Sequence, residues 1–194
     1  EQAVQHKNNQ QLAQDSDAAR ELQALVLQAV QRDALFFSAA LPKRIFNPLF
    51  NRYSGATNFY GDHVDGAILH SRATQQWVRT DISCTLFLAD PDEYEGGELT
   101  VREHEGDKRI KLPAGDAILY PGSTVHQVAP VTRGARLASF FWVESMVRST
   151  EQRRLLFDMD MALLQLRASA GERDPAVVRL TGTYHNLLRM WADS

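Results

Sequence analysis

The spacing of hydrophobic and polar positions divides the chain into three blocks. The first, DSDAARELQALVLQAVQRDALFF, places apolar residues at helical spacing, and Asp15, Ser16 and Asp17 suit the first turn of a helix. The block is therefore predicted to form an amphipathic helix of about 17 residues. Its expected apolar face consists of Leu22, Leu25, Val26, Ala29 and Val30.

The second block, residues 44–143, consists of short apolar or alternating runs such as HVDGAILH and DISCTLFLA. The runs are separated by pairs such as Ser54-Gly55, Gly96-Gly97 and Pro121-Gly122, whose residue types favour reversals of the chain. About eight strands at such short spacing are typical of a β-sandwich or barrel. We therefore predict a mainly β domain.

The third block returns to helical spacing. Ser149 and Gln152 form a capping-box pattern, Gly171 marks a helix end, and Asp174 followed by Pro175 marks the next helix start. The expected apolar positions are Leu155, Met159, Ala162, Leu163 and Leu166 in the first helix, and Val177, Leu180, Tyr184, Leu187, Leu188 and Trp191 in the second. We expect a helical hairpin that docks on the β-domain, because no flexible linker separates them.

Composition and charge limit the partners. The 194-residue chain has a formal net charge of -3 and no basic stripe, so we expect neither nucleic acid nor an anionic membrane as a partner. No apolar run approaches the roughly 20 residues needed to cross a bilayer. Cys84 is the only cysteine, which excludes an internal disulfide and a cysteine-based zinc site and favours a reducing compartment. A cytoplasmic location is therefore predicted.

Two histidines and one aspartate suggest a metal site. His63 and Asp65 lie one residue apart in GDHVDGAIL, and His126 follows much later in GSTVHQVAP. Two imidazoles and a carboxylate suit Fe(II), because they hold one face of an octahedron and leave three positions free. A His-x-Asp pair in a strand also commonly forms only an internal hydrogen bond. Closure of the sheet would bring His126 back to the pair, which favours the metal.

The remaining histidines fit this site less well. His70 is a competing third ligand, but its odd separation from His63 places it on the opposite face of an extended strand. His104 lies among charges in VREHEGDKR and is expected in a solvated hairpin. His6 and His185 lie in terminal or helical segments, where we expect no ligand role.

Arg136 offers an independent indication of an anionic ligand. Strand alternation in ARLASFFWV places three apolar side chains on its face, those of Ala138, Phe140 and Trp142. An arginine on an apolar face is costly unless an anion pairs with it, and its planar fork suits a carboxylate. A cosubstrate carboxylate would meet that need. An arginine at the entrance of a strand could also reach solvent or an acidic side chain.

A family resemblance rests on NRYSGATNFYGDHVDGAI, DISCTLFLADPDEYEGGELTV and GDAILYPGSTVHQVAPVTRGARLASFFWVES. These stretches are similar to Fe(II)/2-oxoglutarate-dependent dioxygenases of the prolyl- and lysyl-hydroxylase type, above all to the bacterial PKHD-type hydroxylases, which include iron-uptake-associated factors. The tail ending YHNLLRMWADS matches the C-terminal extension of that group, so the resemblance covers nearly the whole chain. Relative to that family, the chain looks shortened at its N-terminus.

The resemblance implies a fold and a division of the chain. The fold is a double-stranded β-helix, or jelly roll, with flanking helices. Residues 1–144 would form this domain together with an N-terminal helix, and residues 145–194 would form a C-terminal helical extension docked on it.

The resemblance also implies roles for single residues. His63, Asp65 and His126 match the family's iron ligands, and Arg136 matches the arginine that binds the distal carboxylate of 2-oxoglutarate. Tyr53 matches a tyrosine that often helps to hold that carboxylate, although a core tyrosine with a satisfied hydroxyl would look the same in sequence. The implied cofactors are Fe(II), 2-oxoglutarate and O2, with ascorbate as an optional reductant.

The implied reaction is Fe(II)- and 2-oxoglutarate-dependent hydroxylation of an unidentified substrate, with release of succinate and CO2. The substrate is either a protein side chain or a small molecule, and the sequence gives no oligomeric state. Two other functions stay open. One is a non-catalytic jelly-roll module that binds a metal or ligand. The other is a zinc hydrolase, because the same ligand types bind zinc; against it, the sequence shows no dedicated general base, and Arg136 would have no partner.

Overall fold

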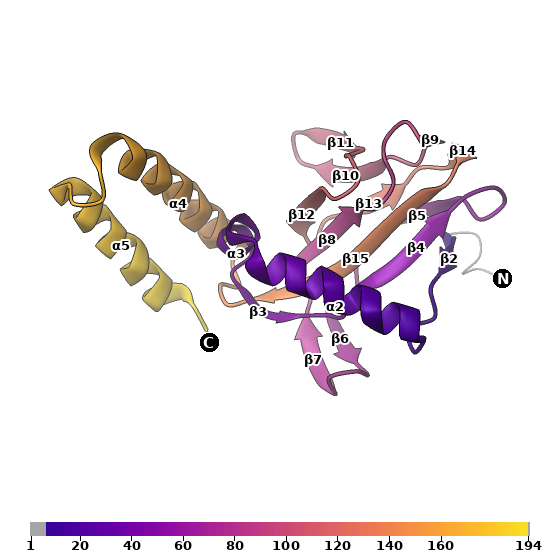
Figure 1. Ribbon diagram of the computed structural model, residues 1–194, viewed down its shortest axis with the longest axis horizontal. Coiled ribbons are helices and arrows are strands. Elements are labelled where there is room, and N and C mark those ends of the chain that lie inside the picture. The colour runs from indigo at the N-terminus through magenta and orange to yellow at the C-terminus, as the bar shows by residue number, and fades with distance from the viewer. Residues whose placement is uncertain (1–6, 194) are drawn as a thin grey trace.

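Two antiparallel sheets form the centre of the molecule, and the computed structural model describes residues 7–193 (Figure 1). In chain order, the strands are β1 (Lys7–Asn8), β2 (Gln10–Gln11), β3 (Pro42–Ile45), β4 (Leu49–Tyr53), β5 (Phe59–His63), β6 (Ile68–Ser71), β7 (Gln76–Arg79), β8 (Ile82–Phe87), β9 (Tyr94–Gly96), β10 (Leu99–Glu103), β11 (Gly106–Ile110), β12 (Ala117–Pro121), β13 (His126–Val128), β14 (Val131–Gly134) and β15 (Arg136–Ser145). One sheet has the order β1-β5-β13-β10-β11, and the other has the order β12-β8-β15-β4-β2, with β3 also paired to β15. Two further strand pairs, β6-β7 and β9-β14, complete the β structure.

This arrangement confirms the predicted mainly β jelly roll with flanking helices. The strands are more numerous than the roughly eight predicted from spacing, because turns divide some of the predicted runs and because β1, β2, β7 and β9 lie outside them. RIFNPLFNRY forms β3 and β4 on either side of Asn47-Pro48, where proline favours a break. HVDGAILH likewise contains the end of β5 and, beyond Asp65-Gly66, most of β6.

Two helices pack against the outer face of the six-stranded sheet, α2 (Asp17–Arg32) and α3 (Ala34–Ala40) (Figure 1). The predicted helix of about 17 residues corresponds to α2, which has 16 residues, whereas α3 is not predicted. Asp33 separates the two helices, because its carboxylate caps α3 by accepting a hydrogen bond from the Phe36 amide at 2.7 Å. Phe36 then packs on Phe141 of the sheet, with ring centroids 6.3 Å apart.

The buried face of α2 agrees with the predicted one only at Val26 and at Val30, which packs against the same core cluster. Ala19, Gln23 and Val26 are its buried residues, whereas Leu22 and Leu25 are exposed. Helical spacing fixes which residues share a face. It does not fix which of two adjacent faces turns toward the sheet when both carry apolar residues.

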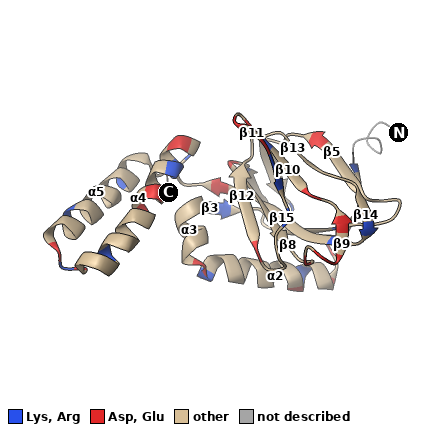
Figure 2. Ribbon diagram, turned by 90° about the horizontal axis from the view of Figure 1, so that it is seen from above, with Lys and Arg blue, Asp and Glu red and all other residues tan. Residues whose placement is uncertain are grey.

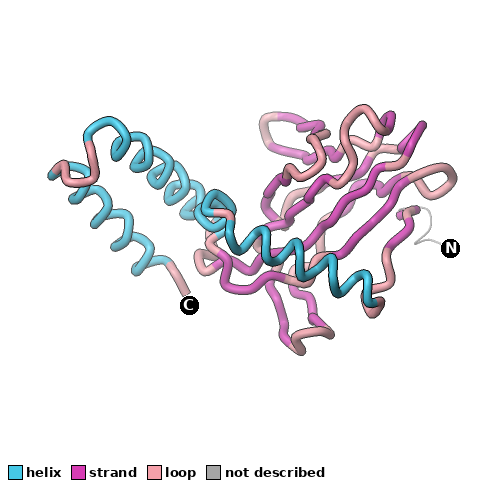
Figure 3. Tube along the Cα trace, in the orientation of Figure 1, coloured by secondary structure: helices cyan, strands magenta, loops and turns pink. Residues whose placement is uncertain are grey.

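The C-terminal block forms the predicted hairpin of α4 (Thr150–Ala170) and α5 (Pro175–Trp191). The caps are confirmed: Ser149 Oγ accepts from the Gln152 amide at 3.2 Å, and Asp174 Oδ1 accepts from the Ala176 amide at 2.8 Å. The hairpin extends away from the sheets (Figures 1 and 3). It contacts the rest of the molecule through α3, which packs on α4, and through the N-terminal end of α4, which follows β15 in the chain.

The core of the hairpin combines residues of both helices with the residue that ends α3 and a residue that follows β15. Its buried members are Leu41, Val147, Leu156, Leu163 and Tyr184. The predicted core position Leu155 is wrong, because its neighbour Leu156 takes that place and Leu155 is exposed.

Acidic and basic residues are interspersed along α2 and α4, whereas α5 carries only the basic residues Arg179 and Arg189 (Figure 2). Within residues 7–193, no helix combines the length and the apolar character needed to cross a membrane.

Candidate active site

β5 and β13 are neighbours in the five-stranded sheet and carry the two histidines of the predicted metal site. His63 and His126 are direct cross-strand partners, and Tyr60 is the partner of Val128. The register therefore advances by three residues on β5 for two on β13, which defines a β-bulge. The bulge turns Tyr60 and His63 to one side, and their rings stack with centroids 3.5 Å apart and an interplanar angle of 14°.

Asp65 follows the end of β5 and completes the group. Its Oδ1 lies 3.9 Å from His63 Nε2, and its Oδ2 lies 3.7 Å from His126 Nε2. The potential ligand atoms of all three residues lie within 4.8 Å of one another. The fold thus brings together the three side chains that the sequence singles out.

Backbone carbonyls orient both imidazoles. His63 Nδ1 lies 2.8 Å from Gly61 O, and His126 Nδ1 lies 3.0 Å from Thr124 O. Because a carbonyl can only accept, each Nδ1 carries a proton and each Nε2 keeps its lone pair on the side of Asp65. Burial lowers the pKa of His63, which favours the neutral form that binds metals.

Ser83 on β8 holds the carboxylate of Asp65. Its buried hydroxyl donates a hydrogen bond to Asp65 Oδ2 at 2.6 Å. Partners of this kind fix the orientation of metal ligands. Two imidazole nitrogens and one carboxylate therefore converge with their lone pairs free, and this donor set fits Fe(II) with open positions left over.

Arg136 on β15 lines the same cavity as the His63, Asp65 and His126 group. Its side chain is 1% exposed, and neither its Nε nor its Nη2 has a hydrogen-bond partner among residues 7–193. The guanidinium lies 5.2 Å from the centroid of the Phe87 ring, a contact that favours a cation but satisfies no N–H group. Burial lowers the pKa of Arg136, yet an arginine remains charged in proteins. A buried cation with free donors calls for an anion.

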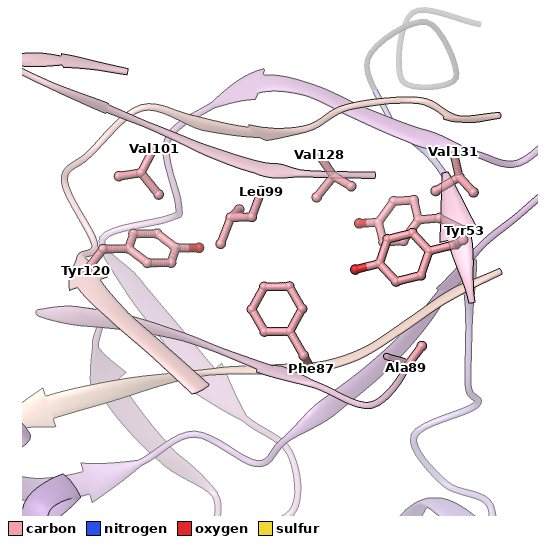
Figure 4. Packing of buried hydrophobic residues seen from close by; sticks show 9 residues of the cluster. Tyr53, Phe87, Ala89, Leu99, Val101, Tyr120, Val128 and Val131 are labelled. Atoms are coloured by element: carbon pink, nitrogen blue, oxygen red, sulfur yellow. The ribbon is translucent and has the colours of Figure 1, made fainter. Parts of the chain in front are cut away.

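Tyr53 on β4 is the cross-strand partner of Arg136 and is also buried. Its hydroxyl accepts a hydrogen bond from Asn51 Nδ2 at 3.2 Å, so its own proton remains available to a ligand. Burial raises the pKa of Tyr53, which keeps the phenol protonated. Figure 4 shows the hydroxyls of Tyr53 and Tyr120 directed toward Phe87 in the space between the sheets.

Among the lining residues to which the sequence gave no role are Lys7, Tyr60 and Ser83. Strand alternation would place Tyr60 opposite His63, and only the bulge brings them together. Lys7, the cross-strand partner of Tyr60, lies with its Nζ 4.9 Å from the centroid of that ring. Phe140 lines the cavity, as its predicted position on the face of Arg136 implies.

The other histidines lie outside the group. His70 is on the β6-β7 pair, where its ring packs against exposed Trp77 with centroids 4.9 Å apart. His104 is exposed in the turn between β10 and β11, and His185 is exposed on α5. His6 lies outside the described residues.

Comparison with known proteins identifies the family. The chain is 64% identical over 193 residues to a PKHD-type hydroxylase of Polaromonas sp. strain JS666, covering 100% of this chain and 85% of the relative. The chain belongs to the PKHD-type hydroxylases. A PKHD-type hydroxylase of Verminephrobacter eiseniae is 62% identical with the same coverage. A Pseudomonas putida prolyl-4-hydroxylase structure is 21% identical, covers 71% of each chain and gives a TM-score of 0.46.

The matched sequence families divide a PKHD-type hydroxylase in two. The 2OG-Fe(II) oxygenase superfamily matches residues 48–144, and the PKHD-type hydroxylase C-terminal domain matches residues 151–193. The chain is therefore a dioxygenase enzyme of a family that uses Fe(II), 2-oxoglutarate and O2. Every candidate residue named from the sequence lies in the first segment, and the α4–α5 hairpin lies in the second.

Proposed function

We propose that this chain hydroxylates a substrate at an iron centre held by His63, Asp65 and His126, consuming 2-oxoglutarate and O2 and releasing succinate and CO2. The single observation that carries the proposal is the position of Arg136. Its unpaired guanidinium N–H groups lie in the same cavity as the three ligating side chains. A ligand that chelates a metal at one end and carries a carboxylate at the other would complete the metal site and also pair with the Arg136 guanidinium.

The protein supplies the geometry of this centre. His63 and His126 would bind Fe(II) through Nε2, because backbone carbonyls take up both Nδ1 protons. Asp65 would contribute one oxygen while Ser83 holds the other. When bound, iron and 2-oxoglutarate supply the oxidising chemistry at the substrate C–H bond.

Arg136 and Tyr53 would fix the far end of the cosubstrate. The free Nε and Nη2 of Arg136 lie on one edge of its planar fork, which suits two parallel hydrogen bonds to a carboxylate. Tyr53 keeps a proton to donate beside it. Apolar walls such as Leu99 and Phe140 exclude water and strengthen these contacts.

The substrate is a protein side chain or a small molecule, and ascorbate as a reductant stays a prediction. Family membership favours this reaction over a zinc hydrolase, in which Arg136 would have no ligand.

The test is anaerobic titration of the Fe(II)-loaded protein with 2-oxoglutarate, followed by its visible charge-transfer band, with succinate release measured on adding O2. Arg136→Leu should weaken 2-oxoglutarate binding about 100-fold, because two charge-assisted hydrogen bonds are lost. Iron affinity should stay unchanged. Arg133→Leu is the matched control, because Arg133 is exposed and paired with Glu95. Equal losses of iron and 2-oxoglutarate binding in Arg136→Leu would contradict the proposal.

A further inference from the structure

A second buried polar group lies unpaired beside Arg136. The hydroxyl of Tyr94 on β9 has no hydrogen-bond partner among residues 7–193, and the residue is 1% exposed. Tyr94 shares a core cluster with Tyr53 and Phe87, the two aromatic residues over which the guanidinium lies. Buried hydroxyls normally find a partner, so an orphan next to an orphaned cation requires an explanation.

The surrounding chain fixes the Tyr94 side chain in this position. Its backbone pairs with Gly134 of β14, and Lys111 Nζ donates to its carbonyl at 2.6 Å while lying 4.0 Å from the centroid of its ring. These contacts anchor both the backbone and the ring. The free hydroxyl is therefore not the result of a loosely held side chain.

Gly97 makes room for Tyr94 and Arg136 to meet. A Cβ at this position would lie 3.1 Å from Tyr94 Cε2 and 3.2 Å from Arg136 Cδ, and 2.8 Å from Val131 Cγ2. Gly97 also has a φ of 69°, which other residues adopt only with strain. The glycine of the EYEGGEL segment thus places the tyrosine ring and the arginine stem against the same small residue.

The chemistry of the two groups calls for an acceptor. Burial raises the pKa of Tyr94, with Arg136 opposing that shift, so the phenol is protonated at neutral pH. A guanidinium offers only donors, so it gives the phenol proton no acceptor. A carboxylate has about four lone-pair sites, enough for both N–H groups of Arg136 and a hydroxyl.

We propose that Tyr94 donates a hydrogen bond to the 2-oxoglutarate carboxylate that Arg136 binds, and that Gly97 keeps the space this contact needs. The inference rests on the proposed function, because it assumes that 2-oxoglutarate occupies the cavity. It assigns a binding role to the EYEGGEL segment, which the sequence left without one.

The test compares two ligands that differ only at the distal end. 2-Oxoglutarate and 2-oxopentanoate, which carries a methyl group in place of the distal carboxylate, are titrated calorimetrically into Mn(II)-loaded protein. Tyr94→Phe should raise the Kd of 2-oxoglutarate about 10-fold and leave that of 2-oxopentanoate unchanged, because only the first accepts the hydrogen bond. Tyr184→Phe, which removes a phenol from the α4–α5 hairpin, should change neither.

The outcomes separate the two proposals. If Arg136→Leu weakens 2-oxoglutarate binding while Tyr94→Phe does not, the role of Tyr94 is overturned and the proposed function stands. If Tyr94→Phe weakens both ligands equally or lowers Mn(II) affinity, Tyr94 has a packing role and the inference is also wrong. If the unmodified protein binds both ligands equally, the carboxylate site itself is wrong, and both proposals fall.

Discussion

Two buried arginines, one in the jelly roll and one at the base of the hairpin, differ in whether their guanidinium N–H groups have hydrogen-bond partners. Arg136 leaves Nε and Nη2 without partners among the described residues. Arg153 on α4 is also buried, but its Nη1 donates to Val147 O and Arg148 O at 2.8 Å and its Nη2 donates to Thr150 Oγ1 at 3.0 Å. Burial alone therefore does not mark a binding site. A buried cation with unsatisfied donors does, because its desolvation is offset only when an anionic ligand arrives.

The contrast extends to the regions around the two arginines. The cavity between the sheets collects titratable side chains from strands far apart in sequence, with lone pairs and N–H groups left free. The hairpin instead buries an apolar cluster that joins its two helices to Leu41 at the end of α3 and Val147 after β15. We infer that the chemistry belongs to the jelly roll and that the hairpin contributes stability.

The largest effect should come from removing a predicted ligand. His126→Ala should lower Fe(II) affinity by more than about 100-fold, since losing only an outer partner of a ligand already costs 10- to 100-fold. The charge-transfer band with 2-oxoglutarate should disappear. His185→Ala on the hairpin is the control and should leave both unchanged, because His185 is exposed on α5. An unchanged band in His126→Ala would refute the metal site.

Substitutions in the core of the hairpin should lower the free energy of unfolding and leave metal affinity unchanged. Leu156 is 1% exposed and Leu155 is 59% exposed, so two adjacent leucines provide a matched pair. Leu156→Ala should lower the free energy of unfolding by about 2–5 kcal/mol. Leu155→Ala should lower it by less than about 0.5 kcal/mol. Denaturant unfolding measures both, and a change in metal affinity in either variant would break the division between the regions.

Replacing each buried arginine by leucine tests the opening comparison directly. Arg153→Leu should destabilise the ligand-free protein by about 1–3 kcal/mol, because carbonyls of Val147 and Arg148 lose their donor. Arg136→Leu should leave the free energy of unfolding of the ligand-free protein unchanged or raise it, because the substitution removes a buried cation without a partner. Comparable losses of unfolding free energy in both variants would show that Arg136 is also structural.

Residue chemistry and local spacing were enough to single out His63, Asp65, His126 and Arg136, because two imidazoles with a carboxylate suit a metal and an arginine on an apolar strand face calls for an anion. The helix caps at Ser149 and Asp174 were likewise readable, since they depend on neighbours in sequence. Residues that depend on strand pairing were not: Tyr60 joins the site through a bulge, and Ser83 through a contact across the fold. The proposed role of Tyr94 likewise rests on its place beside Arg136 in the folded chain. For the same reason the helical spacing of apolar residues predicted the helices, but it wrongly placed Leu22 and Leu155 on their buried faces.

The smallest effect should come from Ser83, which touches the site only through Asp65. Ser83→Ala removes the 2.6 Å hydrogen bond to Asp65 Oδ2 and should lower Mn(II) or Fe(II) affinity about 10-fold. Ser139→Ala is the matched control, because Ser139 is a fully buried serine on β15 whose hydroxyl has no partner among residues 7–193. It should leave metal affinity unchanged. If the two variants behaved alike, orientation of Asp65 by Ser83 would be ruled out, and the jelly roll would owe its metal affinity to the three ligands alone.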